Sequence, residues 1–152
     1  MADSNESVIR NMLQAIQKGD AGSVEKYFTP NWVNHDPSLP PMQGLEGARQ
    51  LIALWSGLSN TQIAIEDSVS QGDRVAVRFS MSGTHTGTMM GIPATGKMVN
   101  LSATGIFRVV NGKATDNWVN FDALGLLQQL GAVQLPVPGK LKFPDPKVLD
   151  NL

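Results

Sequence analysis

The chain has 152 residues, a formal net charge of −1 and 16% charged residues, against about 25% in an average soluble protein. This length fits one domain with a sizeable core, and the near-neutral charge gives no basic surface for nucleic acid or for an anionic membrane. The absence of cysteine excludes disulfides, zinc–thiolate sites, iron–sulfur clusters and a cysteine nucleophile.

The N-terminal residues Met1–Glu6 are polar and acidic, which is unlike a signal peptide. No apolar run approaches the roughly 20 residues that a membrane helix needs. We therefore expect a cytoplasmic protein without a membrane or nucleic-acid partner. The low charge also suggests that a second subunit covers part of the surface, and we predict a homodimer.

The first part of the chain predicts helices. Asp3 or Ser4 caps a first helix that stops at Gly19, and Asp20 caps a shorter second helix that Pro30 ends. An extended piece follows at 31–35 and a proline-stiffened loop at 36–42. A third helix begins near Leu45, because its apolar residues recur at helical spacing: Ala48, Leu51, Ile52, Trp55 and Leu58.

The second part predicts strands over 62–70, 75–81, 98–110 and 113–122, separated by turns at 71–73 and 111–112 and by a glycine-rich loop at 83–96. A short amphipathic helix from Ala123 is closed by Gly131. Helices followed by consecutive hairpin strands predict an α+β fold with the N-terminal helices on one face of a curved antiparallel sheet. We expect one domain over 1–135, and an extended arm over 136–152, which contains four prolines.

The turn at Asn111-Gly112 decides which residues share a face of the last hairpin. A two-residue loop places Leu101 opposite Asp122, whereas a three-residue loop with a glycine bulge places Asn100 opposite Asp122. We prefer the bulged register because it separates a polar face from an apolar one. The polar face would be a concave pocket, and the apolar face an outer dimer contact; the predicted polar face comprises Asn100, Ser102, Thr104, Ile106, Arg108, Ala114, Asp116, Trp118, Asn120 and Asp122.

Asp122 is the best candidate for a catalytic base, because burial at the end of a strand would raise its pKa. The alternative is that Asp122 only caps the helix that begins at Ala123. Arg108 could hold a substrate oxyanion or pair with Asp116. Trp118 could be a core residue or a wall on which substrate stacks.

His35 and His85 are the only histidines. With Asp36 they could imitate a site of two histidines and one carboxylate. Neighbouring residues of an extended segment point to opposite sides, however, so His35 and Asp36 would not bind one ion. We expect no metal and no cofactor, and interpret each histidine as a hydrogen-bonding residue at a pocket rim or as a partner for loop backbone groups.

Several motifs together resemble the SnoaL-like polyketide cyclase family of the nuclear-transport-factor-2-like superfamily, in the right order from Ser7 to Ala132. This resemblance implies a cone-shaped α+β barrel with a deep pocket, usually dimeric. The motifs are His35-Asp36-Pro37, Gly44-x-x-Gly47, Gly72 to Arg78, Gly83-Thr84-His85-Thr86-Gly87, Gly91 to Lys97, Phe107-Arg108-Val109, Gly112-Lys113, Trp118 to Asp122 and Leu130-Gly131.

The resemblance also implies a reaction. Characterised members close a ring by intramolecular aldol condensation without metal or cofactor, and their catalytic aspartate falls on Asp122. Ile106 and Arg108 stand where those cyclases carry a glutamine and a histidine. The expected function is thus a cofactor-independent enzyme acting on a small carbonyl-bearing, polyketide-like molecule. The candidate catalytic residues are Asp122 and Arg108, and the candidate substrate-binding residues are His35, His85, Asn100, Ile106, Trp118 and Asn120.

Three other functions fit the same residues. Epoxide hydrolysis would use an Asp-Arg-Asp set, which Asp116, Arg108 and Asp122 could supply. Isomerisation of the ketosteroid isomerase type would also use an aspartate base. A non-catalytic dimeric protein could bind a small molecule in a pocket of the same shape.

Overall fold

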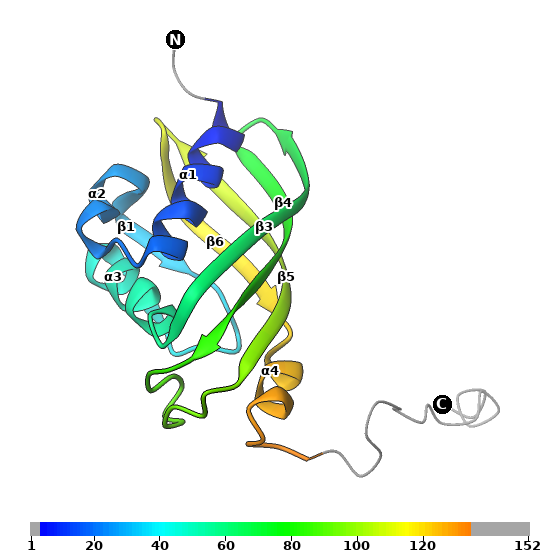
Figure 1. Ribbon diagram of the computed structural model, residues 1–152. Helices are drawn as coiled ribbons and strands as arrows, with labels where there is room; N and C mark the ends of the chain where they lie inside the picture. The colour runs from blue at the N-terminus through cyan, green and yellow to red at the C-terminus, as the bar shows by residue number, and fades with distance from the viewer. Residues whose placement is uncertain (1–3, 135–152) are drawn as a thin grey trace, which may run out of the picture.

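The computed structural model describes residues 4–134, which form a sheet curved around helices (Figure 1). The helical elements are α1 (Asn5–Lys18), the 3₁₀ turn η1 (Ala21–Ser23), α2 (Val24–Tyr27), α3 (Gly44–Trp55) and α4 (Ala123–Gln129). The strands are β1 (Phe28–Asn34), β2 (Met42–Gln43), β3 (Leu58–Gln71), β4 (Arg74–His85), β5 (Met98–Val110) and β6 (Lys113–Phe121).

Helix α1 agrees with the apolar spacing of the sequence. Helix α3 agrees with it as far as Trp55, whereas Leu58, predicted in the same helix, begins β3. The Ser4 hydroxyl accepts a hydrogen bond from the Ser7 amide at the start of α1, and Gly19 ends it in the left-handed conformation. The second predicted helix is wrong in its length. Asp20 makes no side-chain cap, and the chain becomes extended at Phe28, so that Pro30 lies inside β1 where its pairing with β6 is irregular.

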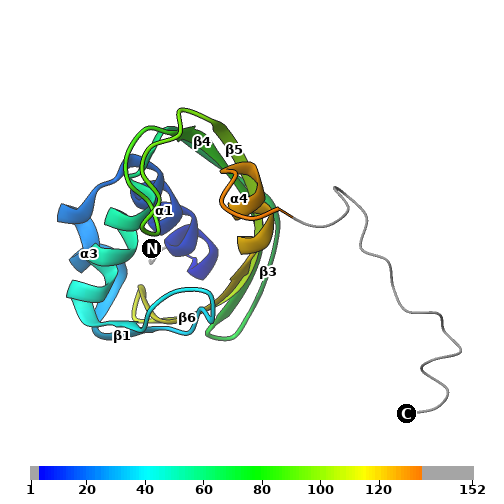
Figure 2. The same ribbon diagram turned by 90° about the horizontal axis from the view of Figure 1, so that it is seen from below.

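The six strands form one sheet in the order β2-β1-β6-β5-β4-β3. Strand β1 runs parallel to β6 and the other neighbours are antiparallel, so the sheet is mixed rather than purely antiparallel. It curls around α1 and α3 without closing, as the view along its axis shows (Figure 2). The predicted α+β class, with N-terminal helices on the inner side of a curved sheet, is confirmed; the sheet is an open one instead of a complete barrel.

The β5–β6 hairpin differs from its predicted register. Val110 pairs with Lys113 across a two-residue turn, and Asn111 and Gly112 both have positive φ, as a type I′ turn requires. The bulge lies just beyond the turn, because Val109 pairs with Ala114 whereas Arg108 already pairs with Asp116. Its effect is to place Arg108, Ile106 and Thr104 on the same face as Asp116, as the sequence predicted, while Ala114 moves to the opposite, buried face.

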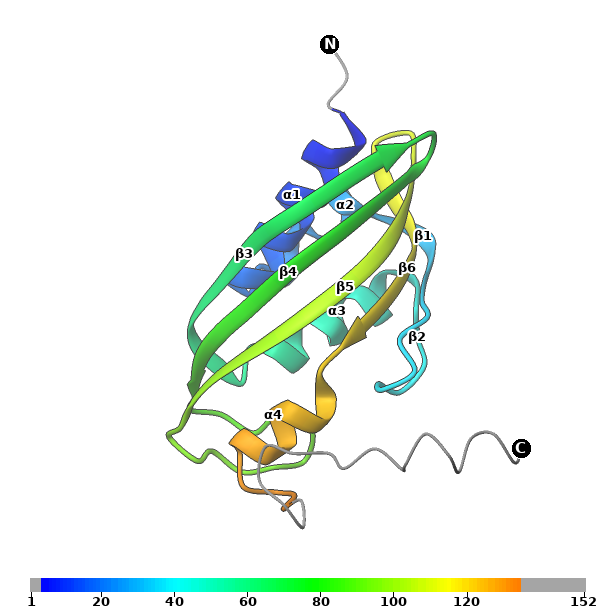
Figure 3. The same ribbon diagram turned by 90° about the vertical axis from the view of Figure 1, so that its right-hand side faces the viewer.

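The prediction that the polar face of the β5–β6 hairpin points inward, into a pocket, is wrong: the apolar face points inward and the polar face outward. Residues of β5 alternate strictly between buried and exposed, and the buried set is the apolar one: Val99, Leu101, Ala103, Phe107 and Val109. This apolar face packs toward α1 and α3, because burying it removes the most apolar surface from water. The opposite face, on which Ile106 and Arg108 pair with Trp118 and Asp116, is therefore the convex outer surface of the sheet. In Figure 3 the helices α1 and α3 lie behind this surface, and no described element covers it.

The predicted arm at 136–152 lies outside the described residues. Among residues 4–134 no helix has the length and apolar character to cross a membrane.

Candidate active-site pocket

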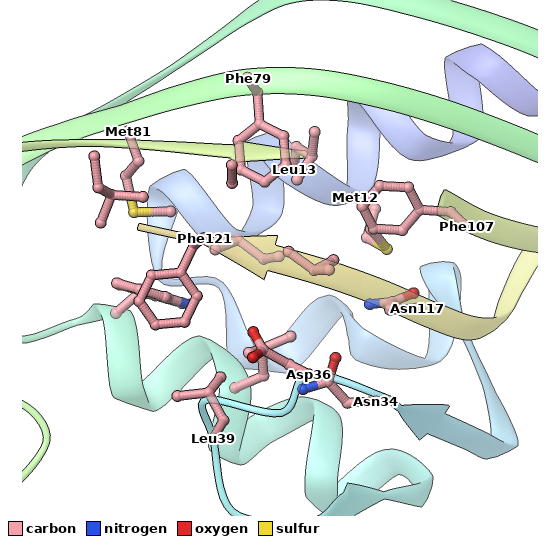
Figure 4. A pocket seen from close by; sticks show the side chains of 16 residues that line it. Met12, Leu13, Asn34, Asp36, Leu39, Phe79, Met81, Phe107, Asn117 and Phe121 are labelled. Carbon is pink, nitrogen blue, oxygen red and sulfur yellow. The ribbon is translucent and has the colours of Figure 1, made fainter. Parts of the chain in front are cut away.

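A pocket lies between the inner face of the sheet and the helices α1 and α3. Its walls are apolar side chains from both layers, including Met12, Trp55, Phe79, Phe107 and Phe121. The cavity has a volume of about 50 Å³. That is room for roughly three to five waters. Only three of the residues that line it are polar: Asn34, Asp36 and Asn117 (Figure 4).

The pairing of β1 with β6 brings these polar side chains together. Asn34 lies directly opposite Asn117 in the parallel register, and the His35 amide donates to the Asn117 carbonyl at 2.7 Å. Because side chains alternate along an extended chain, Asn34 and Asp36 point inward while His35 between them points outward. The loop after β1 then places Leu39 beside Asp36 in the pocket wall.

Asp36 is a buried carboxyl group with only 8% of the residue exposed. Burial raises its pKa above the ordinary 3.8, against the opposing effect of the Ser38 hydrogen bonds. The Ser38 amide donates to Oδ1 at 2.8 Å, which fixes the carboxylate in an Asx turn ahead of Pro37. A desolvated carboxyl with a raised pKa is the type of group that transfers protons near neutral pH.

Two of the pocket's amide groups lack a hydrogen-bond partner. Nδ2 of Asn34 and Oδ1 of Asn117 are buried and unpaired. A buried polar atom without a partner costs about 1–3 kcal/mol of folding free energy, so a ligand or a water that pairs with it is favoured. Trp32 Nε1 and His85 Nε2 are also unpaired, but neither residue lines the pocket.

Asp122 lies outside the pocket and is exposed to solvent. Its Oδ1 accepts a hydrogen bond from the Gly125 amide at 2.8 Å and so caps α4, the alternative role considered from the sequence. Phe79, Ala103 and Phe121 line both the pocket and the shallow depression that contains Asp122. Asp36 lines the first of these hollows and Asp122 the second. The expected burial of Asp122 is wrong, and its catalytic role stays a prediction.

The outer face of the same strands holds a cluster of paired groups. His35 hydrogen-bonds to Asp116 at 3.0 Å, and its ring stacks on Trp118 with centroids 4.8 Å apart. The Arg74 guanidinium lies 4.8 Å from the Trp118 ring centre. Burial raises the pKa of Asp116, but bonds from His35 and Thr115 and the charges of His35 and Arg108 together lower it below its usual value.

Arg108 is also on the outer face. Its Nε donates to Asp73 Oδ2 at 2.8 Å; this bond chiefly lowers the pKa of Asp73 and raises that of Arg108. Arg108 stands opposite Asp116 in the ladder, so the predicted neighbourhood of these two residues is confirmed, although the hydrogen bond goes to Asp73.

The remaining predicted site residues are dispersed. Ile106 and Asn120 are exposed on the outer face, and the Asn100 backbone pairs with the Gln129 side chain through two bonds of 2.8 Å. His85 is fully buried, and its Nδ1 bonds to the Thr95 hydroxyl at 3.0 Å. None of the eight predicted site residues lines the pocket, and their substrate-binding roles stay predictions.

No group of three or more His, Asp or Glu side chains within residues 4–134 is placed to hold a metal ion. The sequence pattern missed Asn34, Asp36 and Asn117. One signal was present, because Trp32, Asn34 and Asp36 alternate along an extended segment, and a buried tryptophan at the first position places the other two on the same inner face.

A carboxyl group buried in an apolar pocket under a curved sheet has the surroundings in which groups that transfer protons to small molecules are found. The model of the SnoaL-like polyketide cyclase family matches residues 6–130, so the chain belongs to that family, as its motifs indicated. The expectation that it belongs to a family of enzymes is thereby confirmed.

Two curated relatives are 26% identical to this chain over 132 residues, which is 82% of its length. They are aklanonic acid methyl ester cyclase DauD of Streptomyces sp. (strain C5), of which 80% is covered, and aklanonic acid methyl ester cyclase DnrD of Streptomyces peucetius, of which 88% is covered.

Solved structures show the same fold. TsrD from Streptomyces laurentii is 27% identical with a TM-score of 0.73, covering 86% of this chain and 100% of that one. Wild-type IdmH from Streptomyces antibioticus is 26% identical with a TM-score of 0.71, covering 85% and 99%.

Proposed function

We propose that this protein is a cofactor-independent cyclase that closes a ring on a small carbonyl-bearing, polyketide-like substrate, with Asp36 as the general base. The observation that carries the proposal is the placement of Asp36, an ionisable group buried in an otherwise apolar pocket. The raised pKa of Asp36 supports the role, because a stronger base takes a proton from carbon more readily than an exposed aspartate does.

The reaction needs no oxidant and no second substrate. The Asp36 carboxylate takes a proton from a carbon next to a carbonyl group, and the electron pair of that C–H bond forms a C–C bond to a second carbonyl carbon of the same molecule. The oxygen of the second carbonyl becomes an alkoxide and receives the proton back from Asp36. Substrate and product are isomers, and apolar walls protect the intermediate from water.

The pocket's size indicates how the substrate would bind. A space of about 50 Å³ is well below the roughly 300–1,000 Å³ of pockets that enclose whole ligands. We infer that only the reacting end of a polyketide-sized molecule enters beside Asp36, or that side chains in the wall move to admit more. Trp55 and Phe121 meet edge to face at 5.5 Å in this wall, and Phe121 also lines the depression that contains Asp122.

The named relatives supply a substrate to test. The purified chain would be incubated with aklanonic acid methyl ester, and the product analysed for a ring-closed isomer of unchanged mass. We expect ring closure by the wild-type chain, loss of about 10²–10⁴ in rate for Asp36→Asn, and near wild-type rate for Asp122→Asn. Equal loss in both variants would require two carboxyl groups, and loss only in Asp122→Asn would restore the role that the sequence predicted.

The same assay in ¹⁸O-water separates the other functions. Ring closure incorporates no solvent oxygen, whereas epoxide hydrolysis through Asp116, Arg108 and Asp122 would place ¹⁸O in the product. Binding without turnover of any carbonyl substrate would favour a non-catalytic protein. The cytoplasmic location and the homodimer stay predictions; sedimentation measurements would give the oligomeric state, with the polar convex face as the surface now available for the contact.

A further inference from the structure

The strand pair that leads to Asp36 carries two amide side chains in the same pocket. Asn34 and Asn117 lie opposite each other in β1 and β6, and they are 9% and 2% exposed. Backbone hydrogen bonds hold β1 against β6 at this point, among them the 2.7 Å bond from the His35 amide to the Asn117 carbonyl. The backbone pairing therefore places both side chains in the same pocket as Asp36 (Figure 4).

The two amides have unpaired atoms of opposite kinds, one hydrogen-bond donor and one acceptor. Asn34 has a buried Nδ2 donor without an acceptor, and Asn117 has a buried Oδ1 acceptor without a donor. No lysine, arginine or histidine lines the pocket, so its remaining wall is apolar except for Asp36. A ligand that fills the pocket and satisfies both amides must bring one oxygen that accepts a hydrogen bond and one group that donates.

We propose that Asn34 and Asn117 act together as an oxygen-binding pair, which holds the two oxygens of the reacting unit while Asp36 moves its proton. This inference rests on the function proposed above. The Asn34 amide would donate to the carbonyl oxygen on which negative charge develops, and the Asn117 oxygen would accept from a neighbouring hydroxyl or enol. Neighbouring strands are about 4.8 Å apart, so the two amides can contact the same small molecule.

Because Asn34 and Asn117 are uncharged, they do not lower the pKa of Asp36 as a nearby positive charge would. An arginine or lysine in the pocket would attract the carboxylate and lower the pKa of Asp36, which would make it a weaker base. A neutral amide stabilises the developing enolate by hydrogen bonding without that cost to the base. The balance of the proton-transfer step is simple: the C–H pair becomes the enolate double bond, the carbonyl π pair moves to the oxygen at Asn34, and Asp36 holds the proton until it is returned.

Exchange of an acidic C–H with solvent tests the pair without requiring ring closure. The probe is ethyl 2-methylacetoacetate, a β-keto ester with one such hydrogen, in deuterated buffer, and its NMR signal at that carbon is followed with the full chain and with variants. We expect Asn34→Leu to lower kcat for exchange about 10²–10³-fold, the loss typical of removing one oxyanion donor. Asn117→Leu should chiefly raise KM. The matched control is Asn31→Leu, an exposed position of the same strand, which should leave both constants unchanged.

The outcomes separate this inference from the proposed function. If Asp36→Asn exchanges the probe as fast as the wild-type chain, Asp36 is not the general base, and the oxygen-binding pair proposed beside it is refuted as well. If Asp36→Asn loses exchange while both leucine variants keep wild-type kcat and KM, the amides hold only buried water, and the pair alone is refuted. Should a leucine variant fail to fold, the isosteric Asn34→Asp and Asn117→Asp replace it. If the oxygen-binding pair is correct, Asn34→Asp lowers kcat because its carboxylate repels the negatively charged enolate oxygen. A wild-type kcat in Asn34→Asp would overturn the proposal.

A structural role would give a different pattern. Loss of packing around Asp36 would change its exposure and shift the acid limb of the pH–rate profile. The oxygen-binding pair predicts instead that Asn34→Leu lowers the rate at every pH and leaves the position of that limb where Asp36 sets it.

Discussion

The two faces of the β1–β6 strand pair carry polar residues in very different states. On the outer face, His35, Asp116, Trp118 and Arg74 are partnered with one another and in contact with water. On the inner face, Asn34 and Asn117 are buried, and each has an atom without a partner. Polar groups that satisfy one another stabilise the strand pair, whereas unsatisfied buried groups beside a cavity are the ones that a ligand would complete. The difference between the faces is therefore the reason for placing the proposed site on the inner face.

The largest expected effect is the difference in stability loss between substitutions of Trp32 in β1 and Trp118 in β6. Trp32 is fully buried and meets Phe28 edge to face at 5.1 Å, so Trp32→Ala should lower the free energy of unfolding by about 3–5 kcal/mol. Trp118→Ala on the outer face should cost less, about 1–2 kcal/mol, because Trp118 is only partly buried and loses its contacts with His35 and Arg74. Urea denaturation of both variants measures this, and equal losses would contradict the assignment of faces.

The next largest effect is on activity, from filling the pocket. Ala103 lines it, and the added carbons of Ala103→Leu would occupy space that the substrate needs beside Asp36. We expect kcat/KM for ring closure to fall about 100-fold, as displacement of a substrate by about 1 Å does, with a well-folded protein. Ser102→Leu is the control, because the next residue along β5 points to the outer face. Comparable loss in both variants would place the reaction outside the pocket.

The pH dependence of the inner carboxyl follows from the direction of its pKa shift. Because burial raises the pKa of Asp36 in the folded protein, kcat/KM should rise as pH increases through a value above 3.8 and then level off. The folded state binds this proton more tightly than the unfolded one, so the group's contribution to stability is greatest in acid and is lost as pH rises through the folded pKa. Asp36→Asn should remove this loss, which unfolding measurements between pH 3 and pH 7 would detect.

The smallest effect belongs to the outer pair. His35→Ala should lower stability by no more than about 1 kcal/mol at neutral pH, because the His35–Asp116 pair is partly exposed and screened. Since the pKa of Asp116 is lowered, its contribution is present above about 3.8 and lost as pH falls through the folded pKa. Ring closure should stay within a few-fold of the wild-type rate; a hundredfold loss would mean that the outer cluster is itself a site.

Much of the fold could be predicted because local patterns agree with it. The Ser4 cap, the Gly19 stop and the spacing of Ala48 to Trp55 define α1 and α3, and strand β5 has its predicted bounds. The parallel pairing of β1 with β6 was not predictable in this way, because a contact between segments about 80 residues apart leaves no periodicity in either of them.

The candidate site was harder to predict for a physical reason. The alternation of polar and apolar residues along β5 and β6 distinguishes a polar face from an apolar one, but it does not predict which face the helices cover. Polarity alone predicts that the polar face lines the pocket, whereas the sheet buries its apolar face. Three polar residues reach the cavity from the end of β1, the loop after it and the middle of β6. Asp122 illustrates the limit, since its position at a strand end fits a base and a helix cap equally, and it caps α4.

The most direct test of this account compares Asp36→Asn with Asp122→Asn in the pH–rate profile of exchange of the β-keto ester. The account predicts that Asp36→Asn loses both the rate and the acid limb, while Asp122→Asn keeps a profile that overlays the wild-type one. A wild-type profile in Asp36→Asn, with the acid limb lost in Asp122→Asn, would contradict it and move the reaction to the outer depression beside α4.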